Sequence, residues 1–308
     1  MDEILERRNF KSGFVAILGR PNVGKSTLLN TLLGGKVSIV SSIPQTTRHQ
    51  IRGVLNLENA QIIFVDTPGI HSFKKELATH LNVVAKRSIQ EVELLLYVVD
   101  VSRSVGKEEE VIMNFLSSQD TQMIMVLNKI DISKDFLNQY IERWQKLIKA
   151  KGKEDLVKYY IPISAKKGTN LDRLKEAIVE LLPFHPPFYD RETLTDFPLK
   201  LRVQDTIREK LFLNLKEELP HSVAVEVKEL ERKENIVYIK ANIYVNRDSQ
   251  KKILIGKEGR FIKEVGKLAR EELEVLFGKK VYLELEVKVL RNWQKKPRIL
   301  KELGYWWV

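Results

Sequence analysis

Short apolar runs alternate with amphipathic segments along the first part of the chain. Three runs, at 14–18, 94–99 and 123–127, are continuous, which predicts strands buried on both faces of a parallel sheet. Further strands are expected at 51–57, 61–65 and 159–163. Apolar residues at helical spacing predict helices at 27–33, 106–117, 136–149 and 171–182. This alternation is typical of a doubly wound α/β domain, whose ligand lies at the carboxyl ends of the strands.

The pattern changes after residue 182. Residues 183–198 contain four prolines among mixed polar residues, which predicts a proline-stiffened linker. The rest of the chain predicts a smaller α+β domain, with helices at 201–219, 250–255 and 260–277 and strands at 223–227, 236–245 and 281–289. We therefore expect a first domain at 1–182, a linker at 183–198 and a second domain at 199–308.

Positive charge is concentrated in the second predicted domain. The 308-residue chain carries a net charge of +11, and residues 235–301 hold 17 Lys and Arg against 8 Asp and Glu. This excess predicts a polyanionic partner, either nucleic acid or an anionic membrane surface. The chain has no cysteine, which fits a reducing cytoplasm. Residues 1–12 lack the apolar core of a secretory signal, and no apolar run is long enough to cross a bilayer.

The first predicted strand and helix are joined by GRPNVGKS, from Gly19 to Ser26. This matches the GxxxxGKS/T pattern in its required strand–loop–helix context, so it predicts a loop that binds the phosphates of a nucleoside triphosphate. Lys25 would reach the β- and γ-phosphates, and the Ser26 hydroxyl would ligate Mg²⁺. The predicted phosphate-binding residues are Asn22, Val23, Gly24, Lys25, Ser26 and Thr27.

Two polar loops follow at the positions expected of nucleotide-sensing segments. The first, residues 44–49, contains two threonines, of which Thr47, or alternatively Thr46, would ligate Mg²⁺ when the γ-phosphate is present. The second begins where the predicted strand 61–65 ends in DTPG. Asp66 would hold Mg²⁺ through a water molecule, and Gly69 would donate its N–H to the γ-phosphate.

Two later strand ends carry residues suited to a guanine base. The strand 123–127 ends in NKID, where the Asp131 carboxylate can accept two hydrogen bonds from guanine that adenine does not offer. Asn128 would contact the base edge and the loop backbone, and the stem of Lys129 would lie over the base. After strand 159–163, backbone N–H groups of Ser164, Ala165 and Lys166 would meet the guanine carbonyl.

These motifs together resemble the translation-factor-related class of small GTPases. The resemblance implies a switch that is on with GTP and off with GDP, with Mg²⁺ as cofactor. Where Ras-like members place a water-orienting glutamine, this chain has Ile70, so no catalytic residue is certain and hydrolysis is expected to be slow unless stimulated. His71 is a weaker candidate for a catalytic base. Asn22 resembles the asparagine of GTPases that use K⁺.

The basic region contains IGKEGR between two predicted helices. Two glycines so placed let a loop press against a nucleic-acid backbone, while cations neutralise phosphates and apolar residues support unstacked bases. The motif and element order resemble a type II KH domain, which implies single-stranded RNA binding. The expected RNA contacts are Ile255, Gly256, Lys257, Glu258, Gly259, Arg260, Ile262, Lys263 and Trp293. For Trp293, packing on the domain core is the favoured alternative.

Over essentially its whole length, the chain resembles a bacterial family that joins such a GTPase to a C-terminal KH domain. The resemblance implies a cytoplasmic, monomeric GTPase that binds the 3′ end of small-subunit ribosomal RNA and acts in assembly of the small ribosomal subunit. Peripheral contact with the inner face of the cell membrane stays open. The alternatives are an RNA-binding scaffold with a vestigial nucleotide site, another ribosome-associated GTPase, or a kinase or ATPase sharing the phosphate loop.

Overall fold

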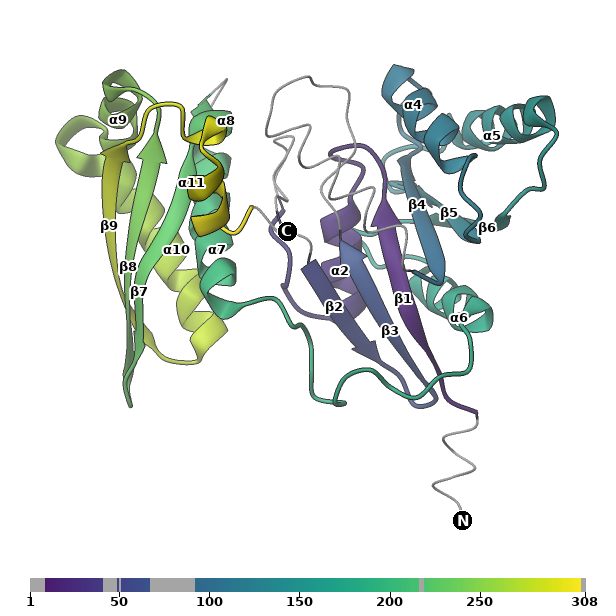
Figure 1. Ribbon diagram of the computed structural model, residues 1–308, viewed down its shortest axis with the longest axis horizontal. Helices are drawn as coiled ribbons and strands as arrows, with labels where there is room; N and C mark the ends of the chain where they lie inside the picture. The colour runs from purple at the N-terminus through teal and green to yellow at the C-terminus, as the bar shows by residue number, and fades with distance from the viewer. Residues whose placement is uncertain (1–8, 41–48, 50, 67–91, 216–218, 306–308) are drawn as a thin grey trace, which may run out of the picture. The chain divides into compact units, whose positions relative to one another are not determined.

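The computed structural model describes residues 9–40, 49, 51–66, 92–215 and 219–305. The chain forms two compact units (Figure 1). The first comprises residues 1–38 and 50–196, and the second comprises residues 39–49 and 197–308. Residues 39–49 therefore belong to the second unit, although the chain order places them between two parts of the first.

The first unit is built on a six-stranded sheet in the order β2-β3-β1-β4-β5-β6. Only β2 runs antiparallel to its neighbour. The strands are β1 (Lys11–Leu18), β2 (Ile51–Asn56), β3 (Ala60–Asp66), β4 (Leu94–Asp100), β5 (Met123–Asn128) and β6 (Val157–Ile163). The helices are α2 (Lys25–Leu33), α4 (Lys107–Leu116), α5 (Leu137–Lys151) and α6 (Leu171–Leu181). The predicted doubly wound α/β fold is confirmed.

Burial explains why the central strands of this sheet read as continuous apolar runs. Every residue of β4 and β5 is buried, and those of β3 are buried as well. Helices on both faces remove the alternation of polar and apolar residues that a one-sided sheet would show. The polar residues that end these strands, including Asp66, Asp100 and Asn128, therefore gather at one edge of the sheet.

The segment predicted as a linker packs along the first unit. The Ser12 hydroxyl donates to the Pro186 carbonyl at 2.6 Å, and the Val54 N–H donates to the Leu194 carbonyl at 2.9 Å. The Gln61 side chain accepts from the N–H groups of Phe188 and Tyr189 at 2.7 and 3.0 Å. Residues up to 196 are thus bound to the sheet, and the division between the two units falls at 196/197.

The second unit contains a three-stranded sheet in the order β7-β8-β9, with β7 (Ala224–Arg232), β8 (Ile236–Val245) and β9 (Lys280–Val289). Strands β7 and β8 are antiparallel, whereas β8 and β9 are parallel. The helices are α7 (Leu199–Asn214), α8 (Leu219–Ser222), α9 (Asp248–Ile255), α10 (Arg260–Phe277) and α11 (Pro297–Glu302). This is the predicted smaller α+β domain.

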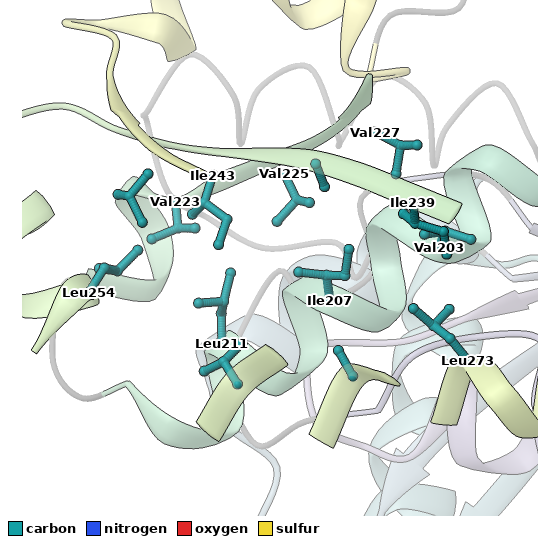
Figure 2. Packing of buried hydrophobic residues seen from close by; sticks show 14 of the residues in the cluster. Val203, Ile207, Leu211, Val223, Val225, Val227, Ile239, Ile243, Leu254 and Leu273 are labelled. Atoms are coloured by element: carbon teal, nitrogen blue, oxygen red, sulfur yellow. The ribbon is translucent and has the colours of Figure 1, made fainter. Parts of the chain in front are cut away.

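The core of the second unit lies between one face of this sheet and two helices. Figure 2 shows Val203, Ile207 and Leu211 of α7 projecting toward the buried valines and isoleucines of the strands. Val265, Ala269 and Leu273 of α10 join the same cluster. Alternate residues of β8 enter this core, so its other residues face away from it.

Among the described helices, none is long and apolar enough to cross a membrane.

Candidate nucleotide and RNA sites

The phosphate loop needs its glycines because neighbouring groups approach its backbone closely. Gly19 has φ +149°, and a Cβ there would lie 2.3 Å from the Val98 carbonyl oxygen. Gly24 has φ +102°, and a Cβ there would lie 2.4 Å from the Asn128 side-chain nitrogen. Helix α2 begins immediately afterwards, at Lys25. The backbone N–H groups of the loop and of this helix N-terminus form the anion-binding arrangement that the motif predicts.

Lys25 lies across this loop. Its Nζ donates to the carbonyls of Gly19 at 3.0 Å and Arg20 at 2.8 Å, and the residue is 7% exposed. Burial lowers the pKa of the Lys25 ammonium to about 8, although the nearby Asp66 carboxylate opposes the shift. The amine is thus held where triphosphate oxygens could replace the loop carbonyls as its partners.

The two predicted Mg²⁺-binding groups among the described residues meet directly. The Ser26 hydroxyl donates to the Asp66 carboxylate at 2.8 Å, and the Ser38 hydroxyl donates to the same oxygen at 2.9 Å. A hydroxyl and a carboxylate oxygen at a phosphate loop are the donors that Mg²⁺ prefers. The other predicted residues of this region lie outside the described part of the chain: Thr46, Thr47, Gly69, Ile70 and His71.

The predicted base-reading residues are brought together by Asn128, at the end of β5. Its side chain donates to the Val23 carbonyl at 2.7 Å and accepts from the Ala165 N–H at 2.9 Å. It therefore links the phosphate loop to the segment after β6. The Asp131 carboxylate accepts from the Ser164 hydroxyl at 2.7 Å. Lys166 is exposed beside them.

Lys129 is fixed by a residue that the sequence analysis missed. It adopts φ +72°, and its Nζ donates to the Asn22 carbonyl at 2.8 Å and to Asp100 at 2.7 Å. Burial would raise the pKa of Asp100, but hydrogen bonds from Lys129 and Ser102 outweigh it, and the pKa is lowered. A signal was present in the sequence, since Asp100 ends an apolar strand that pairs in parallel with the strand ending at Asn128.

Arg20, within the phosphate loop, makes an ion pair that the motif does not predict. Its guanidinium pairs with Glu109 of α4, which is buried. The Tyr140 hydroxyl of α5 also donates to Glu109, at 3.3 Å. Two helices distant in sequence therefore brace one side of the loop.

In the second unit, the glycine loop between α9 and α10 has the expected backbone geometry. Gly256 has φ +72°, and a Cβ there would lie 2.9 Å from the Phe261 Cβ. Glu258 and Gly259 have φ +55° and +74° in the short 3₁₀ turn that leads into α10. A Cβ on Gly259 would come no closer than 3.7 Å to a neighbouring atom, so this side of the loop is open.

The side chains around this loop combine charge with apolar surface. Those of Lys257, Glu258, Arg260 and Lys263 are exposed, and those of Ile255 and Ile262 are half-buried. Glu258 lies 3.8 Å from Arg260 on the exposed surface, where screening makes such a pair weak. The predicted residues at 255–263 therefore form one surface with the chemistry of a single-stranded RNA groove.

Trp293 does not belong to that surface, which corrects the expectation of an RNA contact. The residue is fully buried, its indole N–H donates to the Ser222 carbonyl at 2.8 Å, and its ring lies 6.2 Å from that of Tyr305. An indole with no exposed face cannot stack on a base. The favoured alternative, packing against the domain, is what the structure shows.

The second unit also holds both described ends of residues 39–49. The Val40 N–H donates to Glu209 of α7 at 2.8 Å. His49 is buried, with Nδ1 3.2 Å from the Asp205 carboxylate and Nε2 3.3 Å from the Leu303 carbonyl oxygen. The sequence analysis had placed His49 only in a polar loop. In the sequence, Val40 and His49 flank residues 41–48, which include Thr46 and Thr47.

A phosphate loop, a guanine-reading set and a glycine loop within a basic α+β unit define a GTPase that carries a KH domain. Two family models agree: one described as a 50S ribosome-binding GTPase matches residues 14–129, and one described as a KH domain matches residues 218–294. The chain belongs to the Era family of GTPases. It is 46% identical to GTPase Era of Caldanaerobacter subterraneus over 96% of this chain and 98% of that protein. It is 43% identical to GTPase Era of Staphylococcus epidermidis, over 96% and 97%.

Solved structures support the same assignment. A variant of Era from Aquifex aeolicus bound to GDP and AlF₄⁻ superimposes with a TM-score of 0.89 at 41% identity, covering 96% of this chain and 99% of that one. A second structure, of Era with MgGDPNP and nucleotides 1506–1542 of 16S ribosomal RNA, gives a TM-score of 0.88 with the same identity and coverage. The present chain is therefore a GTPase with the Era arrangement of domains.

Proposed function

We propose that this chain binds the 3′ end of small-subunit ribosomal RNA in a manner controlled by GTP, and that it acts in assembly of the small ribosomal subunit. The observation that carries the proposal is the joining, in one chain, of an intact guanine site to an open glycine loop. The guanine site binds GTP or GDP, and the glycine loop fits an unstacked RNA strand. The similar Era bound to MgGDPNP and a 16S RNA segment supports this combination.

The residues of the first unit have separable roles in this proposal. The loop N–H groups and Lys25 hold the phosphates, Asn128 and Asp131 hold guanine, and Ser26 and Asp66 hold Mg²⁺. Bound Mg²⁺ neutralises charge that develops on the phosphates during hydrolysis. Thr47, or alternatively Thr46, would complete the site as a Mg²⁺ ligand when the γ-phosphate is present, and Gly69 would complete it as a γ-phosphate contact.

Ile70 offers no hydrogen bond to a water molecule, so unaided hydrolysis is slow, and a group supplied in trans can raise it by about 10³–10⁵. We include K⁺, held near Asn22, as a candidate for such a group. Hydrolysis measured in KCl and in NaCl tests this point: faster turnover in KCl supports it, and equal rates reject it.

The similar proteins indicate two different ribosomal targets. The GTPase family model carries the description 50S ribosome-binding GTPase, whereas the RNA in the similar Era complex is 16S ribosomal RNA, from the small subunit. We favour the small-subunit RNA because the Era match spans 96% of this chain, including the KH domain, while the GTPase model spans only residues 14–129. We also propose that the chain acts in the cytoplasm and as a monomer. The excess of Lys and Arg in the second unit also suits an anionic membrane surface, so we include peripheral membrane contact in the proposal.

The deciding experiment compares RNA binding by the wild-type protein and Gly259→Asp. Aspartate tolerates the left-handed backbone, and the position is open, so the variant is expected to fold. Its carboxylate would face RNA phosphates, and we expect affinity for an RNA of the 1506–1542 sequence to fall at least tenfold. The exposed Asp135→Asn in the first unit is the control. Unchanged RNA binding in Gly259→Asp would reject the assigned RNA site.

The principal alternative is an RNA-binding scaffold with a vestigial nucleotide site. The linked contacts of Asn128, Lys129 and Asp131 disfavour it, because a decayed site would not need to keep them. Competition between GTP, GDP and ATP for the purified protein separates this alternative from the proposed function. Binding of guanine nucleotides alone supports the proposal, and no nucleotide binding supports the scaffold. Equal binding of ATP would instead support a kinase or ATPase.

A further inference from the structure

The face of the second unit's sheet that points away from its core carries an exposed aromatic pair. Tyr238 of β8 and Tyr282 of β9 are register partners, 38% and 56% exposed, with ring centroids 5.7 Å apart. A cross-strand tyrosine pair can serve only to stabilise a sheet. Such a role does not require the rings to remain this accessible. The residues around the pair therefore decide whether it only stabilises the sheet or also binds a ligand.

Farther along the sheet, charges on β7, β8 and β9 neutralise one another. Lys240 lies 3.2 Å from Glu284, Lys288 lies 2.9 Å from Glu286, and Lys228 lies 2.9 Å from Glu226. These ion pairs leave little net charge on that part of the sheet. The end of the sheet that holds the two tyrosines is different.

Three exposed lysines gather at the tyrosine end: Lys233 in the turn between β7 and β8, Lys279 in the turn between α10 and β9, and Lys280, the first residue of β9. None of the three makes an ion pair within the described parts of the chain, where two exposed carboxylates lie nearby: Glu231, the cross-strand partner of Tyr238, and Glu234. Lys233 Nζ lies 4.6 Å from the Tyr238 ring centroid. Lys279 Nζ donates to the Lys233 carbonyl at 3.4 Å, which joins the two turns into one surface.

We propose that these residues, Tyr238 and Tyr282 with Lys233, Lys279 and Lys280, form a second contact site for single-stranded RNA, which we call the tyrosine patch. Every unstacked base can stack on an exposed ring, and the cations neutralise the adjoining phosphates. Recognition of this kind does not depend on base sequence. The inference rests on the proposed function, because it extends the RNA path on the same domain.

The tyrosine patch lies at the opposite end of β8 from the glycine loop. Tyr238 is near the start of β8, and α9 with the glycine loop follows the end of that strand, as Figure 1 shows. Seven residues separate Tyr238 from Val245, or about 23 Å at the usual strand rise. An RNA seated on the glycine loop therefore reaches the patch only when it is several nucleotides longer than the groove needs. Linking the two contacts would raise the affinity for long RNA alone.

The test uses random-sequence single-stranded RNA pools of about 6 and about 24 nucleotides, and a duplex of the longer length. Binding is followed by fluorescence anisotropy at low salt with the full chain. The variants are Tyr238→Ala with Tyr282→Ala, the same pair changed to Phe, and Lys279→Glu with Lys280→Glu. The charge-matched control, Lys146→Glu with Lys149→Glu, changes exposed lysines of α5 in the first unit.

The double alanine variant should bind the longer single strand about tenfold more weakly and leave the short RNA and the duplex unchanged. The phenylalanine pair should retain affinity, since it keeps both rings. The patch charge reversal should weaken binding of the long RNA more than the α5 control does. Unchanged binding of the long RNA by the alanine pair, or equal loss for both lengths, overturns the tyrosine patch.

The outcomes also separate the patch from the proposed function. If the long RNA binds equally to wild type and the alanine pair while Gly259→Asp still lowers binding, the patch fails and the proposed RNA site stands. If the wild-type protein binds neither single-stranded pool nor the 1506–1542 RNA, both fail. An effect of the tyrosines on a protein partner, with RNA binding intact, would likewise reject the patch as an RNA site.

Discussion

The imidazole of His49 and the carboxylate of Asp205, 156 positions apart in the sequence, meet at 3.2 Å in the buried interior of the second unit. Asp205 also pairs with the Arg208 guanidinium at 2.8 Å, and Arg208 donates to the Tyr305 hydroxyl at 2.9 Å. His49 follows directly on residues 41–48, which contain the expected switch threonines. This contact attaches His49, the residue that follows those threonines in the sequence, to the interior of the second unit.

Replacing His49 by alanine should weaken that attachment without touching the nucleotide. We expect a loss of about 1–3 kcal/mol in the free energy of unfolding of the second unit, because a buried polar contact and two aromatic contacts disappear. The difference in RNA affinity between the GTP-analogue and GDP states should also shrink. Denaturant melts and RNA titrations check both. His185→Ala, at an exposed histidine of the first unit, is the control, and an unaltered nucleotide effect in His49→Ala contradicts the account.

Asp131→Asn should change which base the protein accepts. The carboxylate suits the two hydrogen-bond donors of guanine, whereas an amide presents a donor that suits the extra carbonyl of xanthine. We expect GTP affinity to fall at least a hundredfold, since a charge-assisted pair of bonds is lost, and affinity for XTP to rise. Competition binding measures both, with the exposed Asp135→Asn as the control. Equal loss of GTP and XTP binding would mean that Asp131 supports the fold instead of reading the base.

The pKa of Lys25 predicts how nucleotide affinity depends on pH. In the ligand-free site burial holds this pKa at about 8, and bound phosphates would raise it. At a pH between these two pKa values, Lys25 is protonated in the nucleotide complex and deprotonated in the free protein. Nucleotide binding therefore takes up a proton above pH 8, and affinity falls with rising pH by at most about tenfold per unit. Calorimetry in buffers of different ionisation enthalpy measures the uptake. Affinity that stays constant from pH 7.5 to 9.5 would count against a titrating Lys25.

Asp100→Asn should weaken guanine nucleotide binding even though Asp100 belongs to none of the recognised motifs. The change removes the charge that holds Lys129 beside the phosphate loop, so its stem is no longer fixed for the base. We expect about a tenfold loss of affinity for both GTP and GDP, in keeping with a charge-assisted hydrogen bond. Asp120→Asn, an exposed carboxylate after α4, is the control. If Asp100→Asn melts at the same temperature as the wild-type protein and binds GDP equally tightly, then Asp100 does not position Lys129.

The sequence carried most of the fold and the nucleotide site because both depend on local patterns. Continuous apolar runs fix parallel buried strands, and the strand–loop–helix context of GRPNVGKS requires glycine where Gly19 and Gly24 meet other backbone and side-chain atoms. Residues Asn128, Asp131 and Ala165 were predicted for the same reason. Asn128 ends β5, and Asp131 and Ala165 follow β5 and β6, whose carboxyl ends share one edge.

What the sequence did not reveal depends on contacts between distant residues. No local pattern distinguishes the buried His49 from a loop histidine, because its partners Asp205 and Leu303 lie far along the chain. The prolines of 183–198 indicated a stiff connection but not that Gln61 would bind it to the sheet. Trp293 stands among cations in the sequence, which left an RNA contact open beside the favoured packing on the core, and its indole N–H donates to the Ser222 carbonyl in the interior.

The central claim is that guanine nucleotide and RNA bind to this chain with coupled free energies. The most direct test measures RNA affinity with a non-hydrolysable GTP analogue, with GDP and without nucleotide, and then measures analogue affinity with and without RNA. We predict tighter RNA binding with the analogue, by at least about fivefold, and the same factor in the reverse titration. A factor of one in both directions, with each ligand bound well by itself, would contradict the account and leave two independent binding domains in one chain.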